Sequence, residues 1–331
     1  MNAAKRRWTQ DEAEALLRKP LFELLDEARA VHRRHFKADA MEKCALLSIK
    51  TGGCPEDCAY CAQSARYPTG LPAQKLMQVD EVKRKAEDAQ RQGATRFCMG
   101  AAWRSPNDRD IPALCGMIRA VKSLGMETCM TIGMLTRAQA ERLKKAGLDY
   151  VNHNIDTSEE HYANVITTRV FQDRLETLRI VREAKMKVCC GVILGLGETL
   201  EDRASMLCTL ANLPEHPKSL PVNRLMPMPG TPLEKATPVE DIEVVRFIAC
   251  CRAMMPRTRV RLSAGRNAMN AAAQSLCFYA GANSIFLGNR LLTAENPSAA
   301  QDAELFERLG LDAGSEASLT ATITPTRQPC Q

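Results

Sequence analysis

The chain reads Cys44-Ala45-Leu46-Leu47-Ser48-Ile49-Lys50-Thr51-Gly52-Gly53-Cys54-Pro55-Glu56-Asp57-Cys58-Ala59-Tyr60-Cys61 where a short apolar run gives way to a loop with three cysteines. The run over residues 44–49 is typical of a β-strand. Gly52, Gly53 and Pro55 allow the following loop to wrap. Three thiols spaced C-x3-C-x2-C can therefore converge on one metal centre, and thiolate sulfur suits zinc or an iron–sulfur cluster.

The number of local ligands helps to separate these two kinds of site. A structural zinc site takes four protein ligands. Three thiolates on a [4Fe–4S] cluster instead leave one iron open to a small molecule. We therefore favour a cluster held by Cys54, Cys58 and Cys61. A zinc site with a distant fourth ligand, or chance clustering in a cysteine-rich chain, remains the alternative.

Short β-like runs alternate with amphipathic helical stretches from about residue 45 onward. Eight runs have the length and composition of strands, over residues 44–49, 95–99, 127–132, 149–154, 187–194, 221–225, 259–262 and 284–287. Helical patterns between them include residues 79–92, 111–124, 137–146, 172–184 and 201–213. The sequence therefore predicts an α/β fold, a single closed (β/α)8 TIM-type barrel. A doubly wound open sheet is the alternative.

The two ends of the chain differ from the alternating part. Residues 9–12, Thr-Gln-Asp-Glu, fit a helix capping box, and Pro20 divides the helical pattern after it. We expect a short helical N-terminal extension over residues 1–40 and the barrel over residues 41–311. Residues 312–331 are rich in Ala, Ser, Thr and Pro, so we expect a disordered tail there.

Composition excludes several classes of function. The 45 Lys and Arg residues exceed the 39 Asp and Glu residues by only six, and the two signs are interspersed, so nucleic-acid binding is not indicated. No apolar stretch is long enough to span a bilayer, and the basic start runs into acidic residues, unlike a signal or transit peptide. We therefore expect no membrane partner and a cytoplasmic protein. Its 14 cysteines then indicate metal binding or catalysis rather than disulfides.

The cysteine loop, with Tyr60 before its third cysteine and a strand before it, is similar to that of radical S-adenosylmethionine (SAM) enzymes. The resemblance to one family in that superfamily, the biotin synthases, runs from about Trp8 to about Gly310. It is carried by residues 47–52, 95–103, 152–157, 195–199 and 260–266. It implies that the open iron of the [4Fe–4S] cluster binds SAM.

Three further cysteines, Cys98, Cys129 and Cys189, lie in separate predicted strands. They can share a site only if the sheet closes, and a buried cysteine is more often a small apolar residue. The resemblance implies that they hold a [2Fe–2S] cluster with Arg261 as the fourth ligand. From residue type alone, a buried arginine would pair with a carboxylate. Because neighbouring strand residues face opposite sides, only Cys189 or Cys190 can face inward, and the resemblance selects Cys189.

Polar residues lie along the fourth predicted strand and just beyond its end. Asn152 and Asn154 alternate, with Asp156 just beyond, so all three can face the barrel interior, although solvation at the strand end is the alternative. The resemblance implies that Asn154 and Asp156 hold the SAM ribose, with Tyr60 in the same cofactor site. It also implies that Asn152, Asn154 and Asn223 lie near the ureido ring of dethiobiotin.

Two segments depart from the pattern of the best-known family members. Residues 291–294 read Leu-Leu-Thr-Ala in place of Leu-Leu-Thr-Thr, so contact with the substrate carboxylate is reduced to Thr293. Residues 226–229 replace a lysine-containing version found in some members. Both differences bear on substrate affinity more than on the chemistry. His153, between the two asparagines, is expected to face outward.

The resemblance implies a sulfurtransferase that inserts sulfur into dethiobiotin, the last step of biotin biosynthesis. It implies reduced flavodoxin or ferredoxin as electron donor and a homodimer. One alternative is another radical SAM enzyme on the same barrel, of the rearrangement or maturase type. A second alternative is a non-catalytic iron–sulfur electron-transfer protein, in which the polar set around Asn154 would have no evident purpose.

Overall fold

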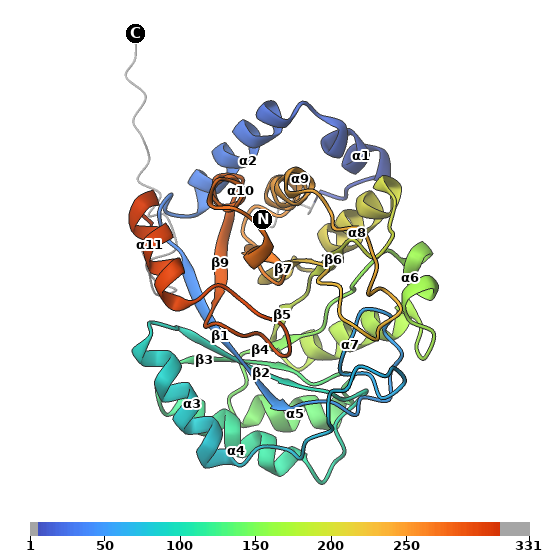
Figure 1. Ribbon diagram of the computed structural model, residues 1–331, viewed down its shortest axis with the longest axis vertical. Coiled ribbons are helices and arrows are strands. Elements are labelled where there is room, and N and C mark those ends of the chain that lie inside the picture. The colour runs from blue at the N-terminus through green and yellow to red at the C-terminus, as the bar shows by residue number, and fades with distance from the viewer. Residues whose placement is uncertain (1–5, 312–331) are drawn as a thin grey trace.

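Nine strands form one sheet in the computed structural model, which describes residues 6–311. They are β1 (Glu42–Lys50), β2 (Arg96–Ala101), β3 (Glu127–Thr131), β4 (Tyr150–Asn152), β5 (Lys187–Cys189), β6 (Val192–Leu194), β7 (Ser219–Arg224), β8 (Arg259–Leu262) and β9 (Ala282–Leu287). Their order is β5-β4-β3-β2-β1-β9-β8-β7-β6, every pairing is parallel, and β5 also pairs with β7. The sheet therefore closes on itself (Figure 1).

β5 and β6 are two halves of one predicted strand, so the barrel has eight strand positions and the closed-barrel prediction is confirmed. The break falls at Gly191, where β7 presents Pro221, which has no N–H to donate. A Cβ at Gly191 would lie 1.9 Å from the Pro221 carbonyl oxygen. The Gly191 N–H donates instead to Oδ1 of Asn154, at 3.1 Å. Because of this break, the backbone at Gly191 forms a hydrogen bond with the side chain of Asn154, just beyond β4.

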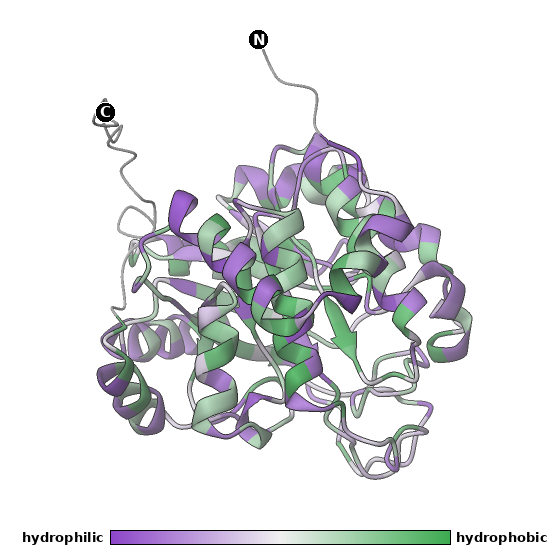
Figure 2. Cartoon of the chain, turned by 90° about the horizontal axis from the view of Figure 1, so that it is seen from above, coloured by the Kyte–Doolittle hydropathy of each residue, from purple (hydrophilic) through white to green (hydrophobic). Residues whose placement is uncertain are grey.

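Helices surround the strands and cover their outer faces. They are α3 (Val79–Arg91), α4 (Ile111–Lys122), α5 (Arg137–Lys145), α6 (Glu159–Val165), α7 (Phe171–Glu183), α8 (Leu200–Asn212), α9 (Asp241–Met254), α10 (Ala271–Tyr279) and α11 (Ala299–Leu309). The five predicted helical stretches are all found, with ends that differ by one or two residues. Figure 2 shows hydrophilic residues gathered on the outer turns of these helices and apolar residues nearer the strands.

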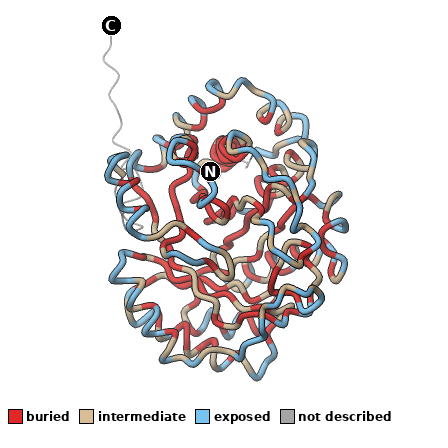
Figure 3. The backbone as a smooth tube through the Cα atoms, viewed as in Figure 1, coloured by how far each residue is buried: buried red, intermediate tan, exposed pale blue. Residues whose placement is uncertain are grey.

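Two helices precede the barrel, α1 (Gln10–Arg18) and α2 (Leu21–His35), and Pro20 separates them as predicted. The capping box at Thr9 is present: the Glu12 N–H donates to Oγ1 of Thr9 at 3.2 Å, and the Thr9 N–H donates to Oε2 of Glu12 at 2.9 Å. α1 packs on α8, and α2 packs on α9. This outer layer explains why α9 is buried on nearly all sides (Figure 3).

The buried residues form two clusters, one on each face of the sheet. The larger lies between the strands and the helices, and the smaller lies inside the barrel and contains four cysteines. Within residues 6–311 no helix has both the length and the apolar character that a membrane span requires. The division into an extension, a barrel and a tail stays a prediction, and the predicted tail over residues 312–331 lies outside the described residues.

Candidate active site

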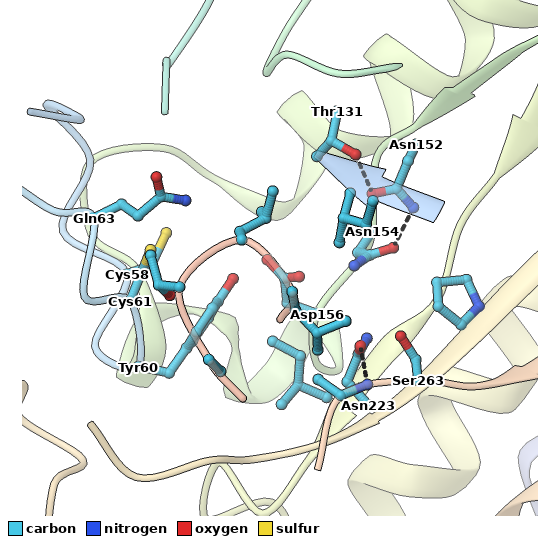
Figure 4. A pocket seen from close by; sticks show the side chains of 18 of the residues that line it. Cys58, Tyr60, Cys61, Gln63, Thr131, Asn152, Asn154, Asp156, Asn223 and Ser263 are labelled. Atoms are coloured by element: carbon cyan, nitrogen blue, oxygen red, sulfur yellow. Dashed lines mark hydrogen bonds between the residues drawn. The ribbon is translucent and has the colours of Figure 1, made fainter. Parts of the chain in front are cut away.

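A cavity of about 340 Å³ opens at the carboxyl ends of the strands, where (β/α)8 barrels place their active sites. All but one of the predicted site residues line it, namely Cys54, Cys58, Tyr60, Cys61, Cys98, Cys129, Asn152, Asn154, Asp156, Asn223, Arg261 and Thr293. The exception, Cys189, belongs to the buried cluster inside the barrel. Figure 4 shows Cys58, Tyr60 and Cys61 on one side of the cavity, Asn152 and Asn154 on the other, and Asp156 between them.

The cysteine loop after β1 is held in a compact shape by backbone turns. Gly52 has a φ of 69°, and a Cβ there would lie 2.6 Å from the Pro72 carbonyl oxygen, so the close approach requires glycine. The Cys54 N–H donates to the Gln63 carbonyl at 2.9 Å, and the Cys61 N–H donates to the Cys58 carbonyl at 2.9 Å. These bonds bring the three thiols to one wall of the cavity.

The chemistry of this loop fits an iron–sulfur cluster. Burial raises the pKa of Cys58 to about 11 and that of Cys61 to about 12, so each thiol gives up a proton when it binds metal. The Arg169 guanidinium lies nearby, with Nη2 3.6 Å from the Cys58 sulfur, and its positive charge favours the thiolate. Three thiolates beside a cation, with a cavity in front of them, are suited to a cluster that carries an open iron.

Asp57 anchors the loop to the segment after α6. Its Oδ1 accepts hydrogen bonds from the N–H groups of Thr167 and Thr168, at 3.0 and 3.1 Å. Partial burial raises the pKa of Asp57, but hydrogen bonds from the Thr167 hydroxyl, from these N–H groups and from the Thr168 hydroxyl outweigh it and hold the pKa at about 2. The anchor therefore stays charged at neutral pH.

Asp57→Ala is expected to make a cluster on this loop lose iron about tenfold faster, because the loop loses its link to the Thr167 segment. The measurement is the rate of iron release from the reconstituted protein to a coloured chelator. Asp57→Asn keeps one acceptor oxygen, so its rate of iron release should lie between those of the wild type and Asp57→Ala. An unchanged rate in Asp57→Ala would show that the loop holds its shape without this anchor.

A chain of hydrogen bonds fixes Asn152, the last residue of β4, and Asn154 just beyond it. Oγ1 of Thr131 donates to Oδ1 of Asn152 at 3.0 Å, and Nδ2 of Asn152 donates to Oδ1 of Asn154 at 3.0 Å (Figure 4). The Gly191 N–H donates to the same Asn154 oxygen. Nδ2 of Asn154 makes no hydrogen bond to another described residue, so it can donate to a ligand in the cavity. Asn152 also reaches the Cys189 sulfur, at 3.3 Å, and links the two parts of the site.

Asp156 is held by a buried arginine on α7. Arg174 donates to Oδ2 of Asp156, and its Nε donates to the Tyr162 hydroxyl at 2.8 Å. Asp156 has a φ of 66°, a left-handed conformation that Asp and Asn tolerate better than most residues, and its carbonyl accepts from the Ile193 N–H at 2.8 Å. Oδ1 of Asp156 has no partner among the described residues. The carboxylate is thus fixed with one oxygen available to a ligand.

The second predicted cluster site lies deeper in the barrel. Cys98, Cys129 and Cys189 are each at most 2% exposed and come from β2, β3 and β5. Hydrogen bonds from the Cys129 and Cys44 thiols, together with Arg261, lower the pKa of Cys98. Cys129 and Arg261 likewise lower the pKa of Cys189, against the effect of burial. Contiguous thiols beside a guanidinium fit a small iron–sulfur cluster.

Arg261 lies at this site, and it also meets the carboxylate that its residue type alone would predict. Its Nε donates to the Ser284 hydroxyl at 2.9 Å, and its Nη2 lies 2.9 Å from the Cys44 sulfur. Oε2 of Glu42 is 3.4 Å from the same Nη2. The pairing with a carboxylate is therefore found, and the role of Arg261 as a cluster ligand stays a prediction.

Cys189→Ser should remove the visible charge-transfer bands of a cluster in the barrel, whereas Cys190→Ser should keep them. Cys189 belongs to the inner cluster of residues, and Cys190 packs in the outer core against the helices. The measurement is the absorbance spectrum after anaerobic reconstitution with iron and sulfide. Loss of the bands only in Cys190→Ser would reverse the assignment, and equal loss in both would show a packing effect.

The remaining predicted residues also line the wall of the cavity. Asn223 is bonded to backbone on both sides, since its Nδ2 donates to the Val192 carbonyl at 2.8 Å and its Oδ1 accepts from the Ala264 N–H at 3.3 Å. Thr293 lies in a turn closed by the Leu291 N–H, which donates to the Ala294 carbonyl at 2.8 Å. His153 also contributes to the wall, although strand alternation predicts that its side chain turns away.

Several residues of the site escaped prediction from the sequence, namely Cys44, Thr131, Arg169 and Arg174. Arg174 looks like an ordinary charged helix residue, and only the fold places it against Asp156. Cys44 does carry a signal, because it alternates with Leu46 along β1 and both belong to the inner cluster. In the described part of the chain, no three His, Cys, Asp or Glu side chains are arranged to hold a single metal ion.

Comparison with protein families gives two matches along the chain. A profile of the radical SAM superfamily matches residues 48–208, which contain the cysteine loop and the polar residues after β4. A profile described as the biotin and thiamin synthesis associated domain matches residues 221–312.

Solved structures share the fold. Methylornithine synthase has a TM-score of 0.80 to this chain, with 19% identity over 94% of this chain and 96% of that one. The fold is also shared with the [FeFe]-hydrogenase maturase HydG from Carboxydothermus hydrogenoformans, at a TM-score of 0.79, with 19% identity over 93% of this chain and 76% of that one.

Curated relatives are much closer in sequence. Biotin synthase of Agrobacterium fabrum is 60% identical, over 91% of this chain and 89% of its own length. Biotin synthase of Methylococcus capsulatus is 58% identical, over 92% and 93% of the two chains. That of Brucella ovis is 57% identical, over 94% of each. Identity at this level over nearly the whole length shows that the chain belongs to the biotin synthase family of radical SAM enzymes.

Proposed function

We propose that this chain is a sulfurtransferase that converts dethiobiotin to biotin with SAM and two iron–sulfur clusters. One observation carries the proposal: a single cavity connects the cysteine loop to the thiols inside the barrel. The amides of Asn152 and Asn154 and the carboxylate of Asp156 line the same cavity, across from the loop cysteines (Figure 4). Two substrates bound along this path would be held between both metal centres.

The three loop cysteines, Cys54, Cys58 and Cys61, would bind a [4Fe–4S] cluster. The inner cysteines, Cys98, Cys129 and Cys189, would bind a [2Fe–2S] cluster, with Arg261 as the fourth ligand. When bound, these groups supply reductive cleavage of SAM to a carbon radical and the sulfur that is inserted. The protein's own contribution is to bind, align and shield the reactants.

The polar residues of the cavity suit the two small molecules. Asn154 offers a free Nδ2 donor and Asp156 a free Oδ1 acceptor, and a ribose has hydroxyl groups for both. Tyr60, on the opposite side, keeps its proton because burial raises the pKa of its hydroxyl. Asn152 and Asn223 would face the ureido ring of dethiobiotin, and Thr293 would contact its carboxylate.

Apolar residues on the same cavity would limit the access of water. Leu225, Met226 and Met228 after β7 lie in the wall with Leu291 and Leu292. A radical that abstracts hydrogen from an unactivated carbon needs such a dry and aligned site. The departures at residues 226–229 and 291–294 lie along this apolar wall, so they would bear on substrate affinity.

The proposal extends to partners and location. The reduced flavodoxin or ferredoxin would supply the electron, and the chain would act as a homodimer in the cytoplasm. All thirteen cysteines in the described part of the chain are free thiols, which suits a reducing compartment. A rearrangement or maturase reaction, or electron transfer alone, is less compatible with a second thiol cluster beside the ligand cavity.

Anaerobic reconstitution followed by incubation with SAM, reductant and dethiobiotin tests the proposal. We expect methionine, 5′-deoxyadenosine and biotin, and none of them from Cys58→Ala. Deoxyadenosine without biotin would favour another radical SAM reaction. No SAM cleavage at all, from protein with full iron content, would favour an electron-transfer role.

A further inference from the structure

Four sulfur atoms, rather than three, meet inside the barrel. Cys44 on β1 is fully buried and belongs to the same inner cluster as Cys98, Cys129 and Cys189. The four cysteines lie on β1, β2, β3 and β5, and β4 separates the last two of these strands in the sheet. Their side chains belong to one contiguous buried cluster inside the barrel.

The side chain of Cys44 contacts Arg261, the residue proposed above as the fourth ligand of the cluster. Nη2 of Arg261 lies 2.9 Å from the Cys44 sulfur. Any iron that Arg261 reaches with this nitrogen is therefore close to a thiol as well. The other buried cysteines differ in this respect, since Cys190 and Cys251 pack in the outer core among helices.

Buried ion pairs hold Arg261 and its neighbours in place beside Cys44. Arg96, Arg259 and Arg261 converge on one buried carboxylate, Glu42, with ion-pair distances of 2.8, 2.7 and 3.4 Å. Glu127 on β3 pairs with Arg96 and Arg259 as well, at 2.9 and 3.6 Å. A thiolate is also a softer ligand than a guanidine nitrogen and suits iron in a cluster better.

We propose that Cys44 is an alternative fourth ligand of the auxiliary cluster and binds iron in place of Arg261. The inference rests on the proposed [2Fe–2S] site. As the sulfur–iron bond forms, the thiol proton leaves to solvent and Arg261 stays protonated as a hydrogen-bond donor to that sulfur. The cluster would then keep four protein ligands even when Arg261 does not bind iron.

The test uses the full chain with Cys54, Cys58 and Cys61 replaced by alanine, so that the auxiliary cluster holds all cluster iron. The protein is reconstituted with ⁵⁷Fe and sulfide, and its Mössbauer spectrum is recorded. In Arg261→Leu we expect two equivalent irons, each bound by sulfur alone. In Arg261→Leu with Cys44→Ser we expect two inequivalent irons, because one of them has a harder ligand, and about tenfold faster loss of iron to a chelator.

The matched control is Arg261→Leu with Cys190→Ser, which removes a buried thiol on the outer side of the strands. Its spectrum should equal that of Arg261→Leu. Identical spectra and rates with and without Cys44 would overturn the inference while leaving the auxiliary cluster in place. Parent protein that binds no [2Fe–2S] cluster at all would overturn the proposed site itself, and the inference with it.

Discussion

Glu42→Gln is expected to lower the free energy of unfolding by about 3–5 kcal/mol, because it leaves buried arginines without their shared carboxylate. Glu42 is 1% exposed and pairs with Arg96, Arg259 and Arg261. The Ser284 hydroxyl donates a further hydrogen bond to it at 2.8 Å. Urea unfolding of the apo protein measures the change without any contribution from bound clusters.

The pH dependence of unfolding shows whether Glu42 stabilises the protein through its charge or through its packing. Burial alone would raise the pKa of Glu42, but Arg96 and the other two arginines hold it well below its ordinary value of 4.5. A carboxyl with a lowered folded-state pKa stabilises the fold fully above its unfolded-state pKa and loses this contribution as the pH falls further. The stability difference between wild type and Glu42→Gln should therefore narrow below about pH 4.5.

Glu127 on β3, which β2 separates from β1, provides the matched control. It pairs with Arg96 at 2.9 Å and Lys187 at 3.0 Å, but its side chain is 19% exposed. Glu127→Gln should lower the unfolding free energy by about 1 kcal/mol, because water partly replaces the lost charge. Equal losses in the two variants would contradict the view that Glu42 stabilises the barrel through buried charge.

The sequence predicts the barrel well because its strands are local patterns. Each predicted strand is a short apolar run between turn residues, and such a run needs no knowledge of its neighbours. The break between Cys189 and Val192 is different, since it depends on Pro221 across the sheet. Gly191 and Pro221 are about 30 residues apart in the sequence, so the hydrophobic pattern of either strand alone does not indicate that they meet.

The site shows the same division between local and distant information. The spacing of Cys54, Cys58 and Cys61 indicates a metal centre from one loop alone. The roles of Cys98, Cys129 and Cys189 needed the resemblance to a family, because separate strands meet only after the barrel closes. Arg174 was not predicted at all: its partner Asp156 is set by a left-handed turn that no helix pattern at residue 174 can reveal.

Asp156→Asn is expected to weaken SAM binding about tenfold to a hundredfold and to lower the unfolding free energy by about 3 kcal/mol. The binding loss follows from removing a charged acceptor, worth about 1.5–3 kcal/mol, that we propose for the ribose. The stability loss follows because the buried Arg174 guanidinium loses its negatively charged partner. Asparagine tolerates the φ of 66° at this position, so the backbone is not strained by the change.

A double variant separates these two effects. Asp156→Asn with Arg174→Met removes both charges of the pair, and stability should return toward wild type because no buried charge is left alone. SAM binding, measured by calorimetry on the reconstituted protein, should stay as weak as in Asp156→Asn. Recovery of both properties would mean that Asp156 only neutralises Arg174. Recovery of stability without recovery of binding places the Asp156 carboxylate in direct contact with SAM.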